Sequence, residues 1–242
     1  VPFAERRIIE MYTYHKATEN GMALHIIETD ASNIRPVQLL KTSNLKGSNE
    51  YGINGGWYTS TKPDDNNCNI LNIAVSGGGV NNKNEPRDGS VSTVGKHAIF
   101  YTGSYMGYME ATNYEDLPGV KGNSRAWAQG GVAMSLGNQN WVSVVNKAVD
   151  VNSDHEGLSA IVVNLDTNKV YLIATAKNVN YVEFRSAIQS YLGLKDSAAT
   201  NDPAWKGLFL DGGASTQLRC AEAEITTGRL LCQVIILKSK AN

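Results

Sequence analysis

Short apolar runs separated by turn residues are the feature that most constrains the fold of this chain. The clearest two runs, residues 158–165 and 169–174, flank a polar turn at 166–168, and this pattern predicts a β-hairpin. Runs 23–29 and 36–40 are expected to form a first strand pair joined by a short turn. Further strands are expected at residues 70–75, 97–102, 131–135, 141–145, 207–210, 216–219 and 230–237.

One segment instead has helical spacing. Apolar side chains recur every three or four residues between 181 and 192, which places them on one face of a helix. Asn180 and Glu183 have the spacing of a capping box at its start, and Gly193 suits its end. The stretch 76–95, rich in Gly and Asn, is expected to form an excursion from the fold. Together these segments predict an α+β fold, mostly mixed or antiparallel sheet with few helices.

The composition favours one folded domain. The chain has 242 residues, of which 42% are hydrophobic and 19% are charged, and this is enough apolar surface for a sizeable core. No linker rich in Pro, Gly or Ser divides it, so we expect a single domain over residues 1–242. No apolar run approaches the ~20 residues of a membrane span. The first residues lack the apolar stretch of a signal peptide, which leaves the compartment open.

The charge balance argues against a nucleic-acid partner. Lys and Arg total 22 against 23 Asp and Glu, which gives a net charge of -1. Binding through phosphate neutralisation needs a basic surplus or a clustered basic stripe, and the longest basic cluster is Arg6-Arg7. No zinc, P-loop or dinucleotide fingerprint occurs, so no cofactor is expected. The oligomeric state stays open.

Two further features leave alternatives open. Among the cysteines, Cys220 and Cys232 are placed to pair across a hairpin, but we favour free thiols at both and at Cys68. The loop 150–156 carries Asp and Asn at alternating positions, similar to a calcium loop. However, His155 stands where such a loop has its glycine, so we expect no metal site there.

The sharpest chemical feature follows the run 207–210. That apolar strand is expected to end at Asp211, which Gly212, Gly213 and Ser215 follow at once. Glycines let a backbone approach a ligand closely, and successive N–H groups can form an anion-binding concavity. An Asp-Gly hairpin turn is the alternative.

Two other stretches combine polar residues with glycines. In the first, Asn54, Gly55 and Gly56 precede two aromatic residues; the Asn side chain offers a donor and an acceptor to sugar hydroxyls. An Asn-Gly turn is the alternative. In the second, Arg125 precedes Gln129 and a pair of glycines. An arginine there is able to hold a phosphate, although most single arginines are solvated surface groups.

The ordered combination of these stretches resembles the phosphodiester glycosidase family over about residues 20 to 238. Asn54-Gly55-Gly56 followed by aromatics, Gln129-Gly130-Gly131 and Leu210-Asp211-Gly212-Gly213-Ala214-Ser215 match three motifs of that family, and Arg229 corresponds to a late arginine. Two departures stand out. Ala214 replaces the third glycine of the last motif, and Leu158 stands where the family has an arginine.

The resemblance implies a hydrolase that cleaves the anomeric C–O bond of a small-molecule or glycan sugar-1-phosphodiester. It places Asp211 as the catalytic carboxylate, with Glu156 or His155 as a second proton carrier. The amides of the glycines after Asp211 and the Ser215 hydroxyl would bind phosphate oxygens, and Asn54 with Gln129 would bind sugar hydroxyls. These residues are therefore expected to meet in one cleft. The family also favours a secreted or cell-surface protein.

Leu158 keeps two other functions open. A module that binds a phosphorylated sugar or nucleotide without cleaving it is one, and a structural or adhesive surface protein that only keeps the fold is the other. If the family arginine grips the phosphate, this chain has either lost that contact or supplies it from Arg125, Arg185, Arg219 or Arg229.

Overall fold

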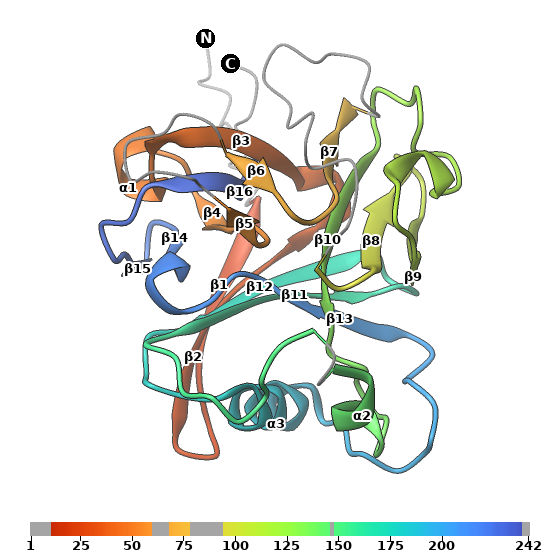
Figure 1. Cartoon of the computed structure of the whole chain (residues 1–242), viewed down its shortest axis with the longest axis vertical. Coiled ribbons are helices and arrows are strands. Elements are labelled where there is room, and N and C mark those ends of the chain that lie inside the picture. The colour runs from red at the N-terminus through yellow and green to blue at the C-terminus, as the bar shows by residue number, and fades with distance from the viewer. Residues whose placement is uncertain (1–10, 60–67, 78–93, 146–147, 239–242) are drawn as a thin grey trace, which may run out of the picture.

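Two stacked antiparallel sheets and a layer of helices make up the structure (Figure 1), a computed structural model that describes residues 11–59, 68–77, 94–145 and 148–238. The larger sheet has nine strands in its described part. Its main path runs β1 (Tyr12–Glu19), β2 (Met22–Asp30), β12 (Lys169–Thr175), β11 (Leu158–Asn164), β13 (Trp205–Phe209), β10 (Trp127–Ala133), β8 (His97–Tyr101) and β9 (Met106–Glu110), and β7 (Ala74–Ser76) also pairs with β10.

The smaller sheet has five strands among the described residues. In spatial order they are β15 (Glu224–Ile225), β14 (Leu218–Arg219), β4 (Gly52–Asn54), β16 (Leu231–Leu237) and β3 (Ile34–Ser43). A short pair, β5 (Tyr58–Thr59) and β6 (Asn69–Ile70), lies apart from both sheets. The α-helices are α1 (Leu45–Ser48), α2 (Trp141–Val145) and α3 (Tyr181–Leu192), and short 3-10 turns occur at Ala31–Asn33, Tyr114–Asp116 and Gly213–Ser215. The predicted α+β class, with mostly antiparallel sheet and few helices, is confirmed.

The central strands of the larger sheet are buried on both faces because the helices cover one face and the smaller sheet covers the other (Figure 1). Strand β11 shows this best. Ala160 and Val162 pack with side chains of α2 and α3, whereas Ile161 and Val163 pack with side chains of the smaller sheet. Alternate residues of a strand point to opposite faces, so a strand that is apolar at both sets of positions fits only a sheet buried on both sides.

Two local predictions hold in detail. The hairpin is confirmed, because β11 pairs with β12 from Leu158 opposite Thr175 to Asn164 opposite Lys169. Helix α3 is confirmed with its capping box, and it ends at Gly193, whose φ is 70°. None of the helices in the described ranges is long and apolar enough to cross a membrane. The predicted excursion at 76–95 lies mostly outside the described residues.

Three strand predictions are wrong. The run 70–75 is not one strand, because it is interrupted between β6, which ends at Ile70, and β7, which begins at Ala74 in another sheet. The runs 23–29 and 36–40 do not pair: β2 pairs with β1 and β12, whereas β3 pairs with β16. The 3-10 turn between them carries the chain from the larger sheet to the smaller one. Residues 141–145 form a helix, because Trp141 and Val145 are four apart and share its buried face, while Val144 is 46% exposed.

The cysteine prediction is also corrected. Cys68 and Cys232 form a disulfide with 5.6 Å between their Cα atoms, and Cys220 is a buried free thiol. Cys220 follows β14 and Cys232 lies in β16, with β4 between these two strands. Two strand spacings amount to about 10 Å, which exceeds the ~7 Å limit for a bridge between Cα atoms. The hairpin pairing is therefore excluded by the strand order.

Candidate functional site

Asp211 lies where the end of the larger sheet meets the smaller sheet. It follows β13 by one residue, after Leu210. Its N–H donates to the Gly55 carbonyl at 3.1 Å. Its carbonyl oxygen accepts from Asn54 Nδ2 at 2.7 Å and from Ser159 Oγ at 2.9 Å. Three hydrogen bonds from two sheets thus fix the backbone that carries this carboxylate.

Asn54 holds this junction together rather than facing a cleft. Its side chain is buried, and its Nδ2 group also donates to the Gly55 carbonyl at 3.1 Å. Its Oδ1 atom accepts from the Gln217 N–H at 3.0 Å. Both amide hydrogens and the oxygen therefore have partners within the chain. The expected contact with a sugar hydroxyl would have to displace one of them.

Gln129 belongs to a second layer behind Asn54. The side chain is fully buried, and its Nε2 atom donates to the Gly130 carbonyl at 2.8 Å. Its Oε1 atom accepts from Gln233 Nε2, and Gln233 Oε1 accepts from the Gly56 N–H at 3.3 Å. The two motifs do meet, but through a buried amide network that the sequence analysis did not foresee.

Close packing explains the glycine pair after Asn54. A Cβ on Gly55 would stand 2.5 Å from the Gln233 side chain, and one on Gly56 would stand 2.6 Å from Asn72 Oδ1. Any larger residue would displace these amides. In this structure the two glycines allow the amide network to pack against the backbone.

Most backbone N–H groups of the turn after Asp211 donate to acceptors within the chain. The Gly212 N–H donates to the Asp211 carboxylate, and the Gly213 N–H donates to the Gly157 carbonyl at 2.8 Å. The Ser215 N–H donates to the Gly212 carbonyl at 3.2 Å. Gly213 has φ +59°, which a residue with a Cβ adopts only with strain. The expected phosphate contacts from the Gly212 and Gly213 amides are therefore taken by partners within the chain.

The Asp211 carboxyl is partly accessible yet closely surrounded. Burial raises its pKa from 3.8 to about 6. The Ser215 hydroxyl, the Arg229 guanidinium and the Gly212 N–H act in the opposite direction, in that order. A carboxyl with a pKa near neutrality is suited to exchanging protons with a substrate.

Two buried polar atoms near Asp211, His155 Nε2 and Thr216 Oγ1, lack hydrogen-bond partners in the described part of the chain, whereas the Ser215 hydroxyl acts on the Asp211 carboxyl. The His155 ring lies against Gly213, with Nδ1 4.0 Å from the position of a Cβ there. The Thr216 side chain packs against Gly157, with its Cγ2 atom 3.1 Å from the position that a Cβ would take on that glycine. A buried polar atom without a partner costs about 1–3 kcal/mol. Their concentration beside one carboxylate therefore points to a site that another molecule completes.

The loop that carries Arg229 is tied to this site. Gln217 Nε2 donates to the Arg229 carbonyl at 2.8 Å, and Thr227 Oγ1 donates to the Ala214 carbonyl. The guanidinium lies over the Tyr58 ring, 5.4 Å from its centre. Arg229 is exposed, but its backbone and its side chain are both held beside the Asp211 turn.

The other arginines serve elsewhere. Arg185 is buried and binds Asp196 at 2.7 Å, and Arg219 donates to the Glu50 carbonyl at 3.2 Å. Arg125 lines a separate pocket that contains no residue of the 211–216 turn. Of the four replacements considered for the family arginine, only Arg229 acts on the Asp211 carboxyl.

Leu158 and Glu156 lie close together in the chain but differ in solvent exposure. Leu158 is fully buried, and its Cδ2 atom lies 2.7 Å from the position of a Cβ on Gly212. An apolar side chain thus packs directly beneath the turn. Glu156, two residues earlier, is exposed.

The calcium-like loop stabilises itself. Asp150 accepts from the Ser153 hydroxyl at 2.8 Å and from the Asn152 N–H at 3.1 Å, and these bonds lower its pKa. Within the described ranges, no three His, Cys, Asp or Glu side chains converge as a metal site would require. The acidic spacing is explained by a capped turn.

Several residues that shape the site were missed by the sequence analysis. Ser159, Gln217 and Gln233 are buried polar residues within or beside apolar runs, and each hydrogen-bonds a residue of a recognised motif. Thr216 directly follows the Asp211 motif. A polar residue at an inward-facing position of an apolar strand was the available signal, since such groups are buried only with partners.

Comparison with known proteins finds the fold but no close relative. No protein-family model and no curated protein matches the sequence. The catalytic domain of zebrafish N-acetylglucosamine-1-phosphodiester alpha-N-acetylglucosaminidase, auto-inhibited by its pro-peptide, is similar in structure. The match has a TM-score of 0.54 and 11% identity, and covers 95% of this chain and 82% of that one. The chain shares the fold of a phosphodiester glycosidase catalytic domain.

A second solved structure supports the same fold. A hypothetical protein from Synechocystis matches with a TM-score of 0.51 and 13% identity, over 93% of this chain and 61% of that protein. The two structural matches establish a common fold. At such low sequence identity they suggest a hydrolase activity at most.

The raised pKa of Asp211 predicts a pH-dependent stability. A carboxyl whose folded pKa of about 6 exceeds its reference value of 3.8 destabilises the fold once it ionises, so stability falls as pH rises between these values. Asp211→Asn is therefore expected to gain about 2 kcal/mol over the wild type at about pH 7.5, and almost nothing at about pH 4. Urea unfolding at the two pH values measures this. An equal gain at both would show that the carboxyl is not shifted.

Proposed function

We propose that this chain is a hydrolase that cleaves the anomeric C–O bond of a sugar-1-phosphodiester, on a small-molecule or glycan substrate. The observation that carries the proposal is the Asp211 carboxyl, with its pKa raised to about 6, the Ser215 hydroxyl beside it, and two unpartnered buried polar atoms nearby, His155 Nε2 and Thr216 Oγ1. The fold shared with a phosphodiester glycosidase catalytic domain supports the reaction class. The net charge of -1 provides no basic surplus that would favour a nucleic-acid substrate.

The chemistry assigned to Asp211 follows from the leaving group. Glycoside cleavage passes through an oxocarbenium-like transition state and normally uses one carboxyl as acid and another as base or nucleophile. A phosphate monoester leaves without much help from an acid, so one carboxylate is sufficient in this proposal. Asp211 stabilises the developing positive charge or takes the proton of the attacking water. Its backbone, fixed by three hydrogen bonds, keeps it in place for either role.

His155 is the better placed of the two proposed second proton carriers. Its Nε2 atom is buried and has no partner among the described residues, and its ring packs against Tyr181 with 5.0 Å between ring centres. An imidazole ring has one nitrogen that can accept a proton and one that can donate a proton. Glu156 is exposed one residue further on and stays the second candidate.

The substrate phosphate is assigned to the open side of the site. A phosphodiester carries a full charge that needs a cation or several donors when it is buried. Arg229 supplies the cation and the Ser215 hydroxyl a donor, whereas Leu158 makes the floor apolar. We therefore place the phosphate toward Arg229 and the sugar toward His155 and Thr216. Asn54 and Gln129 contribute by positioning, because their amides are engaged within the protein.

Replacing Arg229 tests the phosphate contact. Arg229→Ala is expected to weaken the affinity for a sugar-1-phosphodiester by about 1.5 kcal/mol, roughly tenfold, which is the scale of one charged hydrogen bond. Calorimetry in an Asp211→Asn background measures it without consuming the ligand. Arg219→Ala is the matched control, because that guanidinium also lies over a tyrosine, 5.2 Å from the Tyr51 ring centre. A neutral sugar analogue should bind equally to all variants, and equal losses for both ligands would mean that Arg229 acts through packing.

A product assay decides between hydrolysis and simple binding. The protein is incubated with a panel of sugar-1-phosphodiesters, and the reaction is followed by the appearance of free sugar and phosphomonoester. Release of both products supports the proposed function. Ligand that binds to the Asp211 site but is recovered intact after long incubation would favour the sequestering module, which Leu158 keeps open. Absence of binding by any member of the panel would favour a protein that keeps only the fold.

A further inference from the structure

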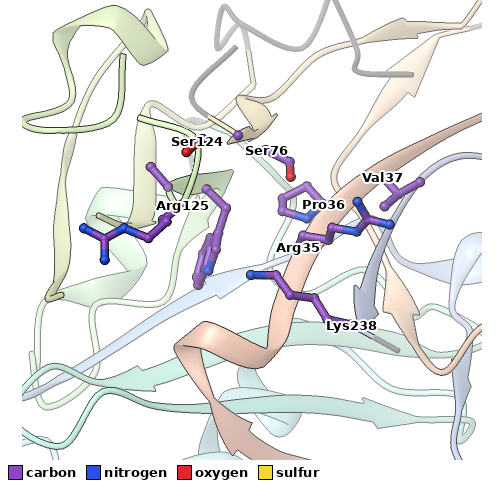
Figure 2. Close-up of a pocket in the computed structure, with 10 residues that line it drawn as sticks. Arg35, Pro36, Val37, Ser76, Ser124, Arg125 and Lys238 are labelled. Carbon is purple, nitrogen blue, oxygen red and sulfur yellow. The ribbon is translucent and has the colours of Figure 1, made fainter. Parts of the chain in front are cut away.

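A pocket outside the Asp211 site is lined by basic side chains and has a volume of about 310 Å³ (Figure 2). Arg35 comes from β3, Lys238 directly follows β16, and Arg125 precedes β10. Ser76 at the end of β7 adds a hydroxyl. Within the described residues, no acidic side chain lines this pocket. Its size is at the lower end of the range for small-molecule sites.

Sheet register places two of these cations on one face. Arg35 lies opposite Ile236, and the Lys238 N–H donates to the Asn33 carbonyl at 2.6 Å. Residues opposite each other in an antiparallel pair share a face, as do residues two apart. Arg35 and Lys238 are therefore diagonal neighbours of like charge. The side chains have no ion pair or hydrogen bond to any described residue.

The two cations affect each other. Burial lowers the pKa of Lys238, and the Arg35 charge lowers it further. Like charges paired across strands are unfavourable unless an anion compensates them. Figure 2 shows the Lys238 amino group reaching toward the middle of the pocket. The Trp127 ring lines the same pocket. That ring is a fixed wall, because Trp127 Nε1 donates to the Ala31 carbonyl at 2.7 Å.

Arg125 differs from this pair. Its side chain packs across Gly103, with Nε 3.1 Å from the position of a Cβ there. Figure 2 shows its guanidinium directed away from Arg35 and Lys238. Figure 2 also shows the Arg35 guanidinium directed toward Val37, away from the Lys238 amino group. Lys238 is therefore the cation that reaches into the pocket, and Arg35 and Arg125 add positive charge at its rim.

We propose that this pocket is a second, non-catalytic anion site, in which Lys238 and the charge of Arg35 hold a phosphate group, with Ser76 as a hydroxyl donor. The phosphate is either free or carried on a sugar, since both present the same group to the cations. The site is independent of the Asp211 chemistry, so it goes beyond the proposed hydrolase function.

The test measures phosphate binding by calorimetry at low ionic strength. All variants are made in an Arg229→Ala background, so that the Asp211 site contributes little. Lys238→Met keeps the side-chain stem and is expected to weaken inorganic phosphate binding roughly tenfold, with a several-fold loss for Arg35→Gln. Arg125→Gln is the matched control and should change the affinity less than about twofold. Lys238→Arg, which restores the charge, should restore binding.

Three results would overturn the proposal: no phosphate binding in the Arg229→Ala protein, unchanged binding in Lys238→Met and Arg35→Gln, or an equal loss in Arg125→Gln. A sugar phosphate that binds more tightly than inorganic phosphate assigns the pocket to the sugar-borne group, and equal affinity assigns it to free phosphate. Lys238→Met alone, with Arg229 intact, should keep full turnover on a sugar-1-phosphodiester. Asp211→Asn should still bind phosphate in this pocket. A failure of the hydrolase proposal and a failure of the anion-site proposal can therefore be told apart.

Discussion

Asp211→Asn is expected to lower turnover on a sugar-1-phosphodiester about 10²-fold or more, because the substitution keeps the shape of the side chain and removes its charge and its exchangeable proton. The backbone hydrogen bonds to Gly55, Asn54 and Ser159 involve main-chain atoms of residue 211, so they survive the substitution. The loss should fall on kcat, with little effect on KM. Steady-state kinetics measures it.

The control is Asp166→Asn, which changes an exposed carboxylate in the β11–β12 turn and should leave turnover unchanged. The wild type should also lose kcat/KM as pH falls through about 6, because protonation removes the carboxylate form of Asp211. Unchanged turnover in Asp211→Asn, with folding intact, would reduce Asp211 to a turn residue and remove the main support for the hydrolase proposal.

Elements that depend on neighbouring residues are predictable from this sequence. Helix α3 is an example, because its apolar spacing, the Asn180–Glu183 capping box and Gly193 all lie within one stretch. The β11–β12 hairpin is another, since both strands and their turn are contiguous. In each case the residues that decide the conformation are a few positions apart, so local propensity and tertiary packing agree.

Strand partners could not be predicted in the same way. β2 and β3 are consecutive, but they belong to different sheets because the turn at Ala31–Asn33 redirects the chain. Their partners β12 and β16 lie more than a hundred residues later, as the pairings Tyr171 opposite Glu28 and Val234 opposite Val37 show. A strand carries little information about which distant strand it joins. The same limitation hid the Cys68–Cys232 bond.

The candidate site was only half predictable. Asp211, Ser215 and Arg229 were singled out from their motif, and the structure groups them. The roles of Asn54 and Gln129 were not accessible, because a sequence shows that an amide can bind a sugar but not that internal partners already occupy it. Asn54 contacts Gln217 and the Asp211 carbonyl, both more than 150 residues away.

The disulfide between Cys68 and Cys232 is expected to contribute the largest single stabilisation that one substitution pair can remove. It joins residues separated by 164 positions, and in the chain-entropy model such a cross-link restricts the unfolded state by about 5 kcal/mol. Measured values are often smaller, so we expect Cys68→Ser with Cys232→Ser to lower the free energy of unfolding by about 3–5 kcal/mol. Urea unfolding of oxidised wild type and the double variant measures the difference.

The position of the bond makes this loss matter for the site. Cys232 precedes Gln233, whose side chain joins Gly56 to Gln129, and Cys68 packs on Cys232 in a small apolar cluster with Ile70. The bond thus clamps the region of β6 to the strand that supports the amide network.

Cys220→Ser is the matched control, because that buried thiol is free. This variant should keep the cross-link in intact-mass analysis after alkylation and lose far less stability. A cross-link that persists in the double variant, or disappears in Cys220→Ser, would assign the pairing to other cysteines. Since such bonds persist only where thiols are not kept reduced, the stability measured under reducing conditions should fall to that of the double variant.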